Sequence, residues 1–164
     1  MGDGGMWLHD WLFSNPTDTD KKILEETLET SGAVIVGGRT YHDAIEDAWG
    51  GCTPFQVPAF VLTHRVPDKL IEGFIFVTDG IESAIAQAKT VASGKNIWIM
   101  GGANIAQQYI KAKIPDELHI HLVPVLLGGG TRLFDNMGSK QIELKKTGLV
   151  ESPAVTHIKF RVVK

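Results

Sequence analysis

The chain has 164 residues, of which 43% are hydrophobic and 21% are charged, so we expect a single domain, residues 1–164, with a sizeable core. The net charge of −3 gives no electrostatic reason to expect a nucleic acid or an anionic membrane as partner. The longest apolar run, residues 122–127, is too short to span a bilayer. The N-terminus has no secretory pattern, and a single cysteine, Cys52, fits a protein of the reducing cytoplasm.

The first half of the chain is predicted to hold two helices and three strands. The first helix runs through Ile23, Leu24 and Leu28. We expect Asp20 or Thr19 to cap its start and Gly32 to end it in a left-handed conformation. The remaining elements are buried strands at short apolar runs and one further helix; the strands lie at residues 33–36, 59–62 and 74–77, and the helix at residues 41–47.

The second half begins with the clearest helix of the chain. An apolar stripe from Ile81 to Ala92 predicts this helix, and Gly94 closes it. The elements that follow are a strand, a helix and a strand, at residues 96–100, 103–111 and 118–125.

The C-terminal segment has a different pattern, in which apolar and polar residues alternate. Ile158, Phe160 and Val162 alternate with His157, Lys159 and Arg161, which is typical of a half-exposed strand; its expected partner is residues 141–145. The other strands alternate with helices, which implies parallel strands with helices on both faces. The sequence therefore predicts an α/β fold with a mixed, mostly parallel sheet and an antiparallel C-terminal strand pair.

Two strand-to-helix junctions carry paired glycines, Gly37-Gly38 and Gly101-Gly102. Glycines at the end of a strand let a ligand approach the backbone, and the next helix presents free N–H groups and its positive dipole end. A pyrophosphate suits such a site, and two junctions suit a dinucleotide. The alternative is that the glycines only form tight turns, since neither junction is a Rossmann or P-loop motif.

Two arginines follow the ends of predicted strands, which is the ligand edge of an open α/β sheet. Arg39 and Arg65 can each bind a phosphate through a two-pronged hydrogen bond. The strand that ends at residues 62–65 has no Asp or Glu, the residue that would favour an unphosphorylated ribose. We therefore expect NADPH rather than NADH, with two solvated surface arginines as the alternative.

Possible catalytic side chains are few. His119 and His121 share one strand face, but no further zinc ligands accompany them, so we expect no metal site. His121 is a candidate proton donor in a substrate pocket, with a structural histidine as the alternative. Asp10 and Trp11 precede the first helix: Asp10 is a candidate proton source, and Trp11 would either stack on a planar heterocycle or pack on the core.

Four segments occur in one order: Val34-Ile-Val-Gly-Gly-Arg-Thr-Tyr, Val61-Leu-Thr-His-Arg, Ile99-Met-Gly-Gly-Ala-Asn and Asp116-Glu-Leu-His-Ile-His-Leu-Val-Pro-Val-Leu-Leu-Gly-Gly-Gly-Thr-Arg-Leu-Phe. Together they resemble the dihydrofolate-reductase-like superfamily, most of all the reductase domain of the riboflavin-biosynthesis deaminase–reductase. The resemblance implies a three-layer α/β fold, NADPH as hydride donor, a pyrimidine- or pteridine-type acceptor and, commonly, a homodimer.

The resemblance also assigns cofactor-binding positions. It implies three groups of positions: a first phosphate-binding turn, a segment around the 2′-phosphate, and a glycine-rich turn beneath the pyrophosphate and nicotinamide. These positions are Gly37, Gly38, Arg39, Thr40, Thr63, His64, Arg65, Gly101, Gly102, Ala103, Asn104 and Ile105. His121 falls on the strand position that bears a pocket-facing hydroxyl residue in dihydrofolate reductase.

Two features depart from the family pattern. The family opens with a central strand and a Ser-Leu-Asp-Gly-like turn, whereas this chain opens with Met-Gly-Asp-Gly-Gly. We expect the missing first strand upstream of residue 1, with a genuine variant as the alternative. In addition, no carboxylate of residues 18–26 aligns with the acid that assists protonation in dihydrofolate reductase, which disfavours folate as substrate.

The expected function is therefore reduction of a pyrimidine- or pteridine-type metabolite by NADPH, as in the 5-amino-6-(5-phosphoribosylamino)uracil reductases of the riboflavin pathway. Dihydrofolate reductase is the alternative enzyme. A non-catalytic nucleotide-binding domain is the alternative of another class.

Overall fold

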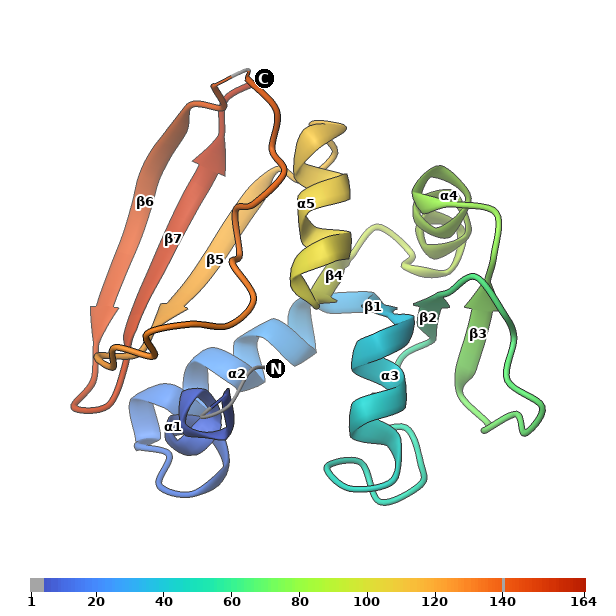
Figure 1. Cartoon of the computed structure of the whole chain (residues 1–164), viewed down its shortest axis with the longest axis horizontal. Helices are drawn as coiled ribbons and strands as arrows, with labels where there is room; N and C mark the ends of the chain where they lie inside the picture. Colours follow the sequence, from blue (N-terminus) through green and yellow to red (C-terminus); the bar gives the residue numbers. More distant parts are fainter. Residues whose placement is uncertain (1–4, 140) are drawn as a thin grey trace. The chain divides into compact units, whose positions relative to one another are not determined.

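The computed structural model describes residues 5–139 and 141–164, and it contains two compact units (Figure 1). One unit comprises residues 26–108, and the other combines the described residues up to 25 with residues 109–164. The expectation of an upstream first strand rests partly on the opening of the chain. That opening, residues 1–4, lies outside the described residues. The expectation of a single domain stays a prediction.

The unit of residues 26–108 is built on a four-stranded parallel sheet in the order β3-β2-β1-β4. Its strands are β1 (Ser31–Gly37), β2 (Ala59–Leu62), β3 (Phe74–Val77) and β4 (Asn96–Gly101). All seven residues of β1 are buried, as expected of the apolar run that predicted this strand. In the register of the sheet, Val36 of β1 lies between Val61 of β2 and Gly101 of β4.

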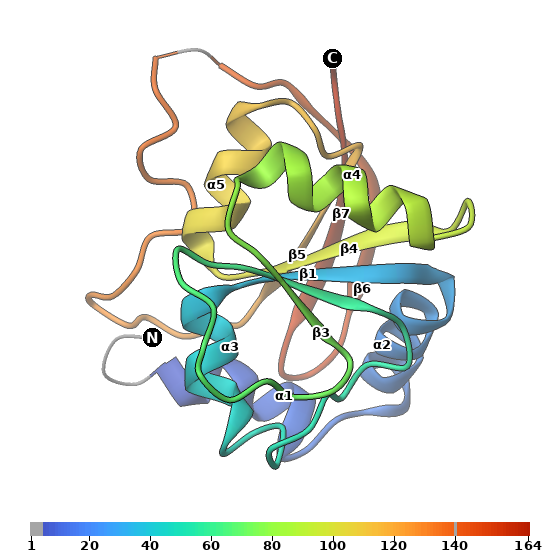
Figure 2. The ribbon, with the colours of Figure 1, turned by 90° about the vertical axis from the view of Figure 1, so that its right-hand side faces the viewer.

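Two helices, α3 (Gly38–Ile45) and α4 (Ile81–Val91), cover opposite faces of this sheet (Figures 1 and 2). The apolar stripe of α4 packs on β1 and β2, with Ala84 and Ala88 fully buried. We expected Gly32 to end the preceding helix, but it lies inside β1. A Cβ atom at Gly32 would lie 2.3 Å from the backbone oxygen of Ala92, so the glycine allows strand and helix end to approach closely.

The core beneath α3 is rich in aromatic rings. Tyr41 packs edge-on against Phe74 and Phe76, with ring centroids 5.0 and 5.2 Å apart. Trp49 stacks on Phe74 at 5.6 Å. These rings enclose Val34, Val36 and Val61, which belong to the same buried cluster. Such packing fixes the ends of β1 and β2, from which the loops at the carboxyl edge of the sheet emerge.

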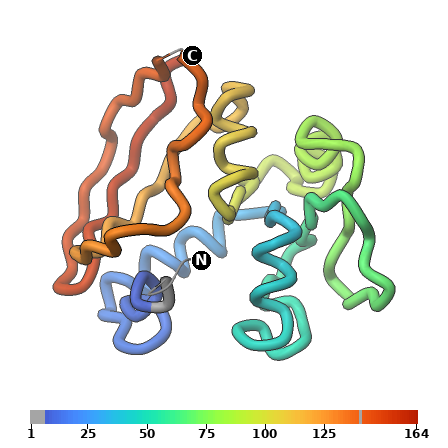
Figure 3. Tube along the Cα trace, in the orientation of Figure 1, coloured from blue at the N-terminus to red at the C-terminus, as the bar shows by residue number. Residues whose placement is uncertain are grey.

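The other unit holds a three-stranded antiparallel sheet in the order β5-β7-β6, whose strands lie side by side in Figure 3. They are β5 (Glu117–Leu122), β6 (Leu144–Glu151) and β7 (Thr156–Val162). The expected antiparallel pair is present, but in a sheet of its own, and β5, which we expected among the parallel strands, joins it. The partner of β7 is β6, which overlaps the predicted residues 141–145 only at Leu144 and Lys145. Strand β5 ends before the predicted residue 125, because Pro124 has no N–H to donate to a ladder.

Helix α2 (Asp18–Thr30) starts with a reciprocal cap that differs from the predicted one. Thr17 is the N-cap residue, and its hydroxyl accepts a hydrogen bond from the Asp20 N–H at 3.2 Å. In return, the Asp20 carboxylate accepts from the Thr17 N–H at 2.9 Å and from its hydroxyl at 2.7 Å. This is a capping box with Asp at the third helical position, so neither Thr19 nor Asp20 is the N-cap.

The remaining helices are η1 (Gly5–His9), α1 (Asp10–Phe13) and α5 (Ala103–Lys111). Helix α5 has the predicted bounds. In the described part of the chain, no helix has the length and apolar character needed to cross a membrane.

Candidate functional site

The carboxyl edge of the parallel sheet contains a reversal of strand order. From β1 the chain proceeds to β2 and β3 on one side, whereas β4 lies on the other side of β1. Ligands of open α/β sheets bind in the crevice at such a reversal, outside the carboxyl ends of the strands. Gly37-Gly38 ends β1 and Gly101-Gly102 follows from β4, so both glycine pairs lie at this point.

The two glycine pairs are in close contact. A Cβ atom built on Gly37 would lie 3.3 Å from Cγ2 of Ile105 and 3.7 Å from both Gly101 O and Gly102 N. A Cβ atom on Gly102 would lie 3.1 Å from the Thr40 hydroxyl. Gly101 has φ of 124°, a conformation that L-residues rarely adopt. The predicted turn residues of β1 and β4 therefore form one continuous backbone surface.

The end of β2 joins the same surface through Thr63. A Cβ atom on Gly38 would lie 2.9 Å from the Thr63 hydroxyl, which donates to the backbone oxygen of Arg65 at 3.0 Å. The hydroxyl thus orders the turn that carries His64 and Arg65. Three of the predicted segments, at the ends of β1, β2 and β4, converge on one edge.

Two helices begin at this edge, α3 at Gly38 and α5 at Ala103. The N-cap of α3 is Gly37, which has no side chain to bond the first N–H groups. The start of the helix therefore offers backbone donors and a positive dipole end to an anion.

The polar side chains expected to select the cofactor are exposed. Arg39, His64 and Arg65 all lie on the surface. Arg65 pairs with Asp68, Nη2 to Oδ1, at 3.4 Å, and both side chains remain more than four-fifths exposed. Asn104 accepts a hydrogen bond from Gln108 at 2.8 Å. A pair as exposed as Arg65–Asp68 is weak, so Arg65 can exchange it for a phosphate at little cost.

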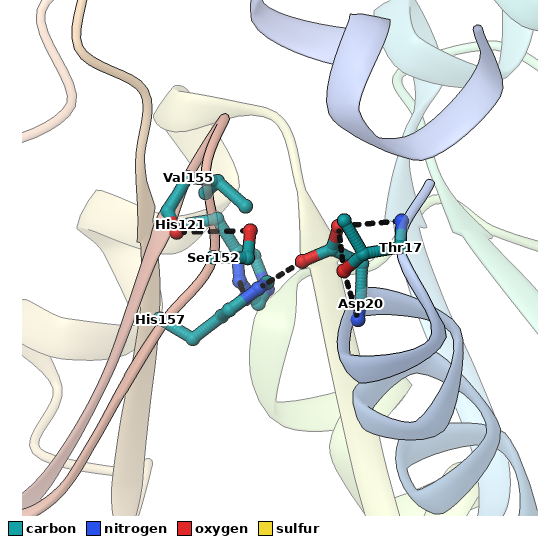
Figure 4. A network of polar contacts seen from close by, with 6 residues as sticks. All are labelled: Thr17, Asp20, His121, Ser152, Val155 and His157. Carbon is teal, nitrogen blue, oxygen red and sulfur yellow. Dashed lines mark hydrogen bonds and ion pairs between the residues drawn. The ribbon is translucent and has the colours of Figure 1, made fainter. Parts of the chain in front are cut away.

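The other unit contains a chain of polar contacts that starts at His121 on β5 (Figure 4). Nδ1 of His121 lies 2.7 Å from Nδ1 of His157 on β7, the residue opposite it in the strand register. Nε2 of His157 lies 2.9 Å from Oδ1 of Asp20 on α2. Trp11 packs against both rings, with centroids 5.0 Å from His121 and 5.2 Å from His157.

Burial differs along this chain of contacts. Asp20 is fully buried and His157 is 4% exposed, whereas His121 is exposed. Burial raises the pKa of Asp20, but hydrogen bonds from His157, Thr17 and Ser152 outweigh this effect and hold the pKa well below its usual value. Partial desolvation of the His121 ring, together with His157 and His119, lowers the pKa of His121 to about 4.

The other candidate residues from the sequence do not join this chain of contacts in the same way. Trp11 is buried, which agrees with the interpretation that it packs on the core. Asp10 is exposed and accepts a hydrogen bond from the Ser14 hydroxyl at 3.2 Å, apart from the histidine pair. His119 lies 3.1 Å from Glu117. Among residues 5–139 and 141–164, no three His, Cys, Asp or Glu side chains form a group that could hold a metal ion.

Sequence reasoning missed two members of this network. The alternating pattern predicts His157 on the polar face of a half-exposed strand, but it is buried. The sequence predicts Asp20 only as a possible helix cap and assigns no carboxylate of this helix a role in a site. The sequence separation of 137 residues between Asp20 and His157 explains why no local pattern pointed to the pair.

Comparison with known proteins identifies the class of fold. The structure matches that of a putative riboflavin biosynthesis protein from Shewanella sp. PV-4 with a TM-score of 0.76 and 23% identity, over 97% of this chain and 88% of that chain. It matches dihydrofolate reductase from Enterococcus faecalis with a TM-score of 0.59 and 21% identity, over 89% and 82% of the two chains. The fold is therefore of the dihydrofolate-reductase-like α/β class, as predicted.

The family follows from the sequence. The model of the RibD C-terminal domain matches residues 3–158. The chain is also 30% identical to the Bacillus subtilis protein named "Uncharacterized protein YwjB" over 142 residues, which are 84% of this chain and 78% of that protein. The chain belongs to the RibD C-terminal domain family.

Proposed function

We propose that this protein is an NADPH-dependent reductase of a pyrimidine- or pteridine-type metabolite, similar to the reductases of the riboflavin pathway. The observation that carries the proposal is the convergence of the ends of β1, β2 and β4 at the reversal of strand order. A site with three backbone turns, two helix starts and two exposed arginines matches the shape and charge of a phosphorylated dinucleotide.

The residues of this edge fit the cofactor. The space that a Cβ atom would take at Gly102 is open except for the Thr40 hydroxyl at 3.1 Å, and nothing lies within 4 Å of the corresponding position at Gly101. Gly38, Arg39 and Thr40 would hold one phosphate, and the turn at Gly101 and Gly102 would lie beneath the pyrophosphate. When bound, the reduced nicotinamide supplies a hydride to the acceptor.

Arg65 and Thr63 would hold the 2′-phosphate that distinguishes NADPH from NADH. The Thr63 hydroxyl orders the turn, and the guanidinium of Arg65 is largely solvent-exposed beside Asp68. A hydrogen bond to a charged group contributes about 1.5–3 kcal/mol, which corresponds to a preference for NADPH of roughly tenfold or more.

Dihydrofolate reductase is a second candidate function. It is favoured by the match to the E. faecalis enzyme, whose structure was determined with NADP(H). At 21% identity that match shows the fold alone. The two candidates differ in the acceptor. An enzyme that reduces a folate-type acceptor should bind methotrexate, whereas an enzyme that reduces a riboflavin-pathway acceptor should not.

The experiment measures dissociation constants for NADPH and NADH, and then NADPH oxidation with dihydrofolate and with pyrimidine acceptors of the riboflavin pathway. We expect NADPH to bind at least about tenfold more tightly than NADH, and Arg65→Ala to remove most of that difference. Asp68→Asn is the matched control, because it frees the guanidinium and should retain the preference. Equal affinities for the two cofactors, or a variant that keeps the preference, would contradict the assignment.

A further inference from the structure

The turn that follows β2 carries an acidic residue to which the proposed function gives no role. Asp68 is the only acid among residues 59–71, and its Oδ1 atom lies 3.4 Å from Nη2 of Arg65. We propose that Asp68 determines cofactor specificity: it competes with the 2′-phosphate of NADPH for Arg65 and so limits the preference for NADPH over NADH. The inference rests on the proposed function in taking Arg65 as the residue that binds this phosphate.

The backbone of Arg65 is held by Thr63. The Thr63 hydroxyl donates a hydrogen bond to the Arg65 backbone oxygen at 3.0 Å and accepts one from the Arg65 N–H at 3.4 Å. The N–H of Thr63 donates in turn to the backbone oxygen of Val77 on β3 at 3.0 Å. The backbone of Arg65 is therefore anchored to the sheet, and the direction of its guanidinium is what can change.

The residues between Arg65 and Asp68 keep the carboxylate within reach of this guanidinium. They are Val66 and Pro67, and the segment is not helical, so the contact is not the usual ion pair along a helix surface. The proline ring fixes its own φ angle and disfavours helical conformations of the residue before it. Because both intervening residues are restricted, the carboxylate is positioned beside the guanidinium before a ligand binds.

The Asp68 carboxylate and a phosphate need the same hydrogen-bond donors. Each is an anion that accepts hydrogen bonds from the guanidinium of an arginine. The side chains of Arg65 and Asp68 are 84% and 94% exposed, so a phosphate can displace the carboxylate. An exposed ion pair of this kind changes an equilibrium constant by at most about fivefold. Breaking it therefore weakens NADPH binding without preventing it.

Displacement does not remove the charge of Asp68 from the turn. A phosphate within hydrogen-bond distance of the Arg65 guanidinium would lie next to a carboxylate that is itself 3.4 Å from that group. The two anions repel each other, and salt screens the repulsion. Competition and repulsion both act against NADPH. Neither acts against NADH, which carries a hydroxyl in place of this phosphate.

The same carboxylate suits NADH. In sites that select this cofactor, an Asp or Glu accepts a hydrogen bond from the 2′-hydroxyl of the ribose. Asp68 can accept such a bond while it remains paired with Arg65, since a carboxylate has several acceptor positions. An acid beside the phosphate-binding arginine therefore makes the site less strict for NADPH than Arg65 alone would make it.

The first test measures dissociation constants for NADPH and NADH by isothermal titration with the wild type, Asp68→Asn and the control Glu72→Gln. Glu72 precedes β3, at the opposite edge of the parallel sheet, so removing the same charge there should have no effect. We expect Asp68→Asn to bind NADPH about threefold to fivefold more tightly than the wild type, and NADH no more tightly. The gain for NADPH should shrink as the salt concentration rises.

The second test asks whether the effect acts through Arg65. In an Arg65→Ala background no guanidinium remains for which Asp68 could compete. Adding Asp68→Asn to that background should therefore change the NADPH dissociation constant by less than about twofold, which is the error of additivity. Adenosine 2′-monophosphate and adenosine 5′-monophosphate locate the effect on the cofactor: Asp68→Asn should bind the first more tightly than the wild type does and the second equally well.

The outcomes separate the two proposals. A wild-type protein that binds neither cofactor would reject the proposed function and, with it, this role of Asp68. A wild type that prefers NADPH through Arg65, with an Asp68→Asn variant that binds both cofactors as Glu72→Gln does, would reject only the role of Asp68. An equal gain from Asp68→Asn with and without Arg65 would also reject it, because the effect would then not act through the arginine.

Discussion

At the scale of single residues, two glycines at the carboxyl edge of the parallel sheet lie close to threonine side chains. Gly38 and Gly102 do not have the positive φ angles that would demand glycine, but added side chains there would meet Thr63 and Thr40. The absence of a Cβ atom at these positions therefore keeps the backbone of two strand ends accessible. The proposed binding of a pyrophosphate at this edge would need that access.

Gly102→Val tests this interpretation. The branched side chain would occupy the space above the turn, so we expect a folded protein whose NADPH affinity is at least about tenfold lower, a loss of about 1.4 kcal/mol. Isothermal titration measures the affinity, and circular dichroism measures the fold. Gly148→Val is the control, because a Cβ atom at this strand position makes only an ordinary contact, 3.5 Å from Lys159. An unfolded Gly102→Val variant would mean that the glycine serves the turn alone.

At the scale of elements, Gly32 fixes the distance between β1 and the end of α4. We expect Gly32→Ala to destabilise the protein by about 1–3 kcal/mol, as for overpacked cores, because the added Cβ would clash with the backbone oxygen of Ala92 at 2.3 Å. Chemical denaturation measures the change. Gly148→Ala, in the exposed strand β6, should change the free energy of unfolding by far less. An equal effect of both variants would contradict the packing argument.

Elements bounded by sharp sequence signals were predicted closely. Strands β2 and β3 and helix α5 have the predicted bounds, because each is an apolar or amphipathic segment flanked by proline or glycine. Strand β6 was predicted poorly: all but one of its residues are exposed, so burial imposes no alternation on its sequence. The paired glycines and the arginines that we propose to bind the cofactor could be placed at the edge of the sheet from the sequence, because they follow the ends of these strands.

The histidine network could be predicted only at His121. In the sequence, His157 shares its pattern with Lys159 and Arg161, and only its contact with the buried Asp20 distinguishes it. The burial of both residues depends on tertiary structure that brings α2 to β7, which no local propensity encodes.

At the scale of the whole molecule, the network links stability to pH. The folded-state pKa of Asp20 lies below its value of about 3.9 in unfolded chains, so the unfolded state binds more protons in acid. Its contribution is present above that value and is lost as the pH falls toward the folded-state pKa. His121 acts in the same direction between its unfolded value of about 6.5 and its folded value of about 4.

We therefore expect the melting temperature of the wild type to fall as the pH is lowered from 7 to 4 and further in stronger acid. His121→Asn should flatten the curve above pH 4, and Asp20→Asn should flatten it below, where the lowered pKa acts. His42→Asn, at an exposed histidine on α3 that lies outside the network, should follow the wild type. Parallel curves for all four proteins would show that these residues do not carry the pH dependence.

The most direct test of the central claim is an amide NMR titration with NADPH and with NADH. We expect chemical-shift changes at residues 37–40, 63–65 and 101–105, the three turns that meet at the reversal of strand order, and binding of NADPH at least about tenfold tighter than that of NADH. Saturable binding whose shift changes lie elsewhere, or no binding of either cofactor, would contradict it.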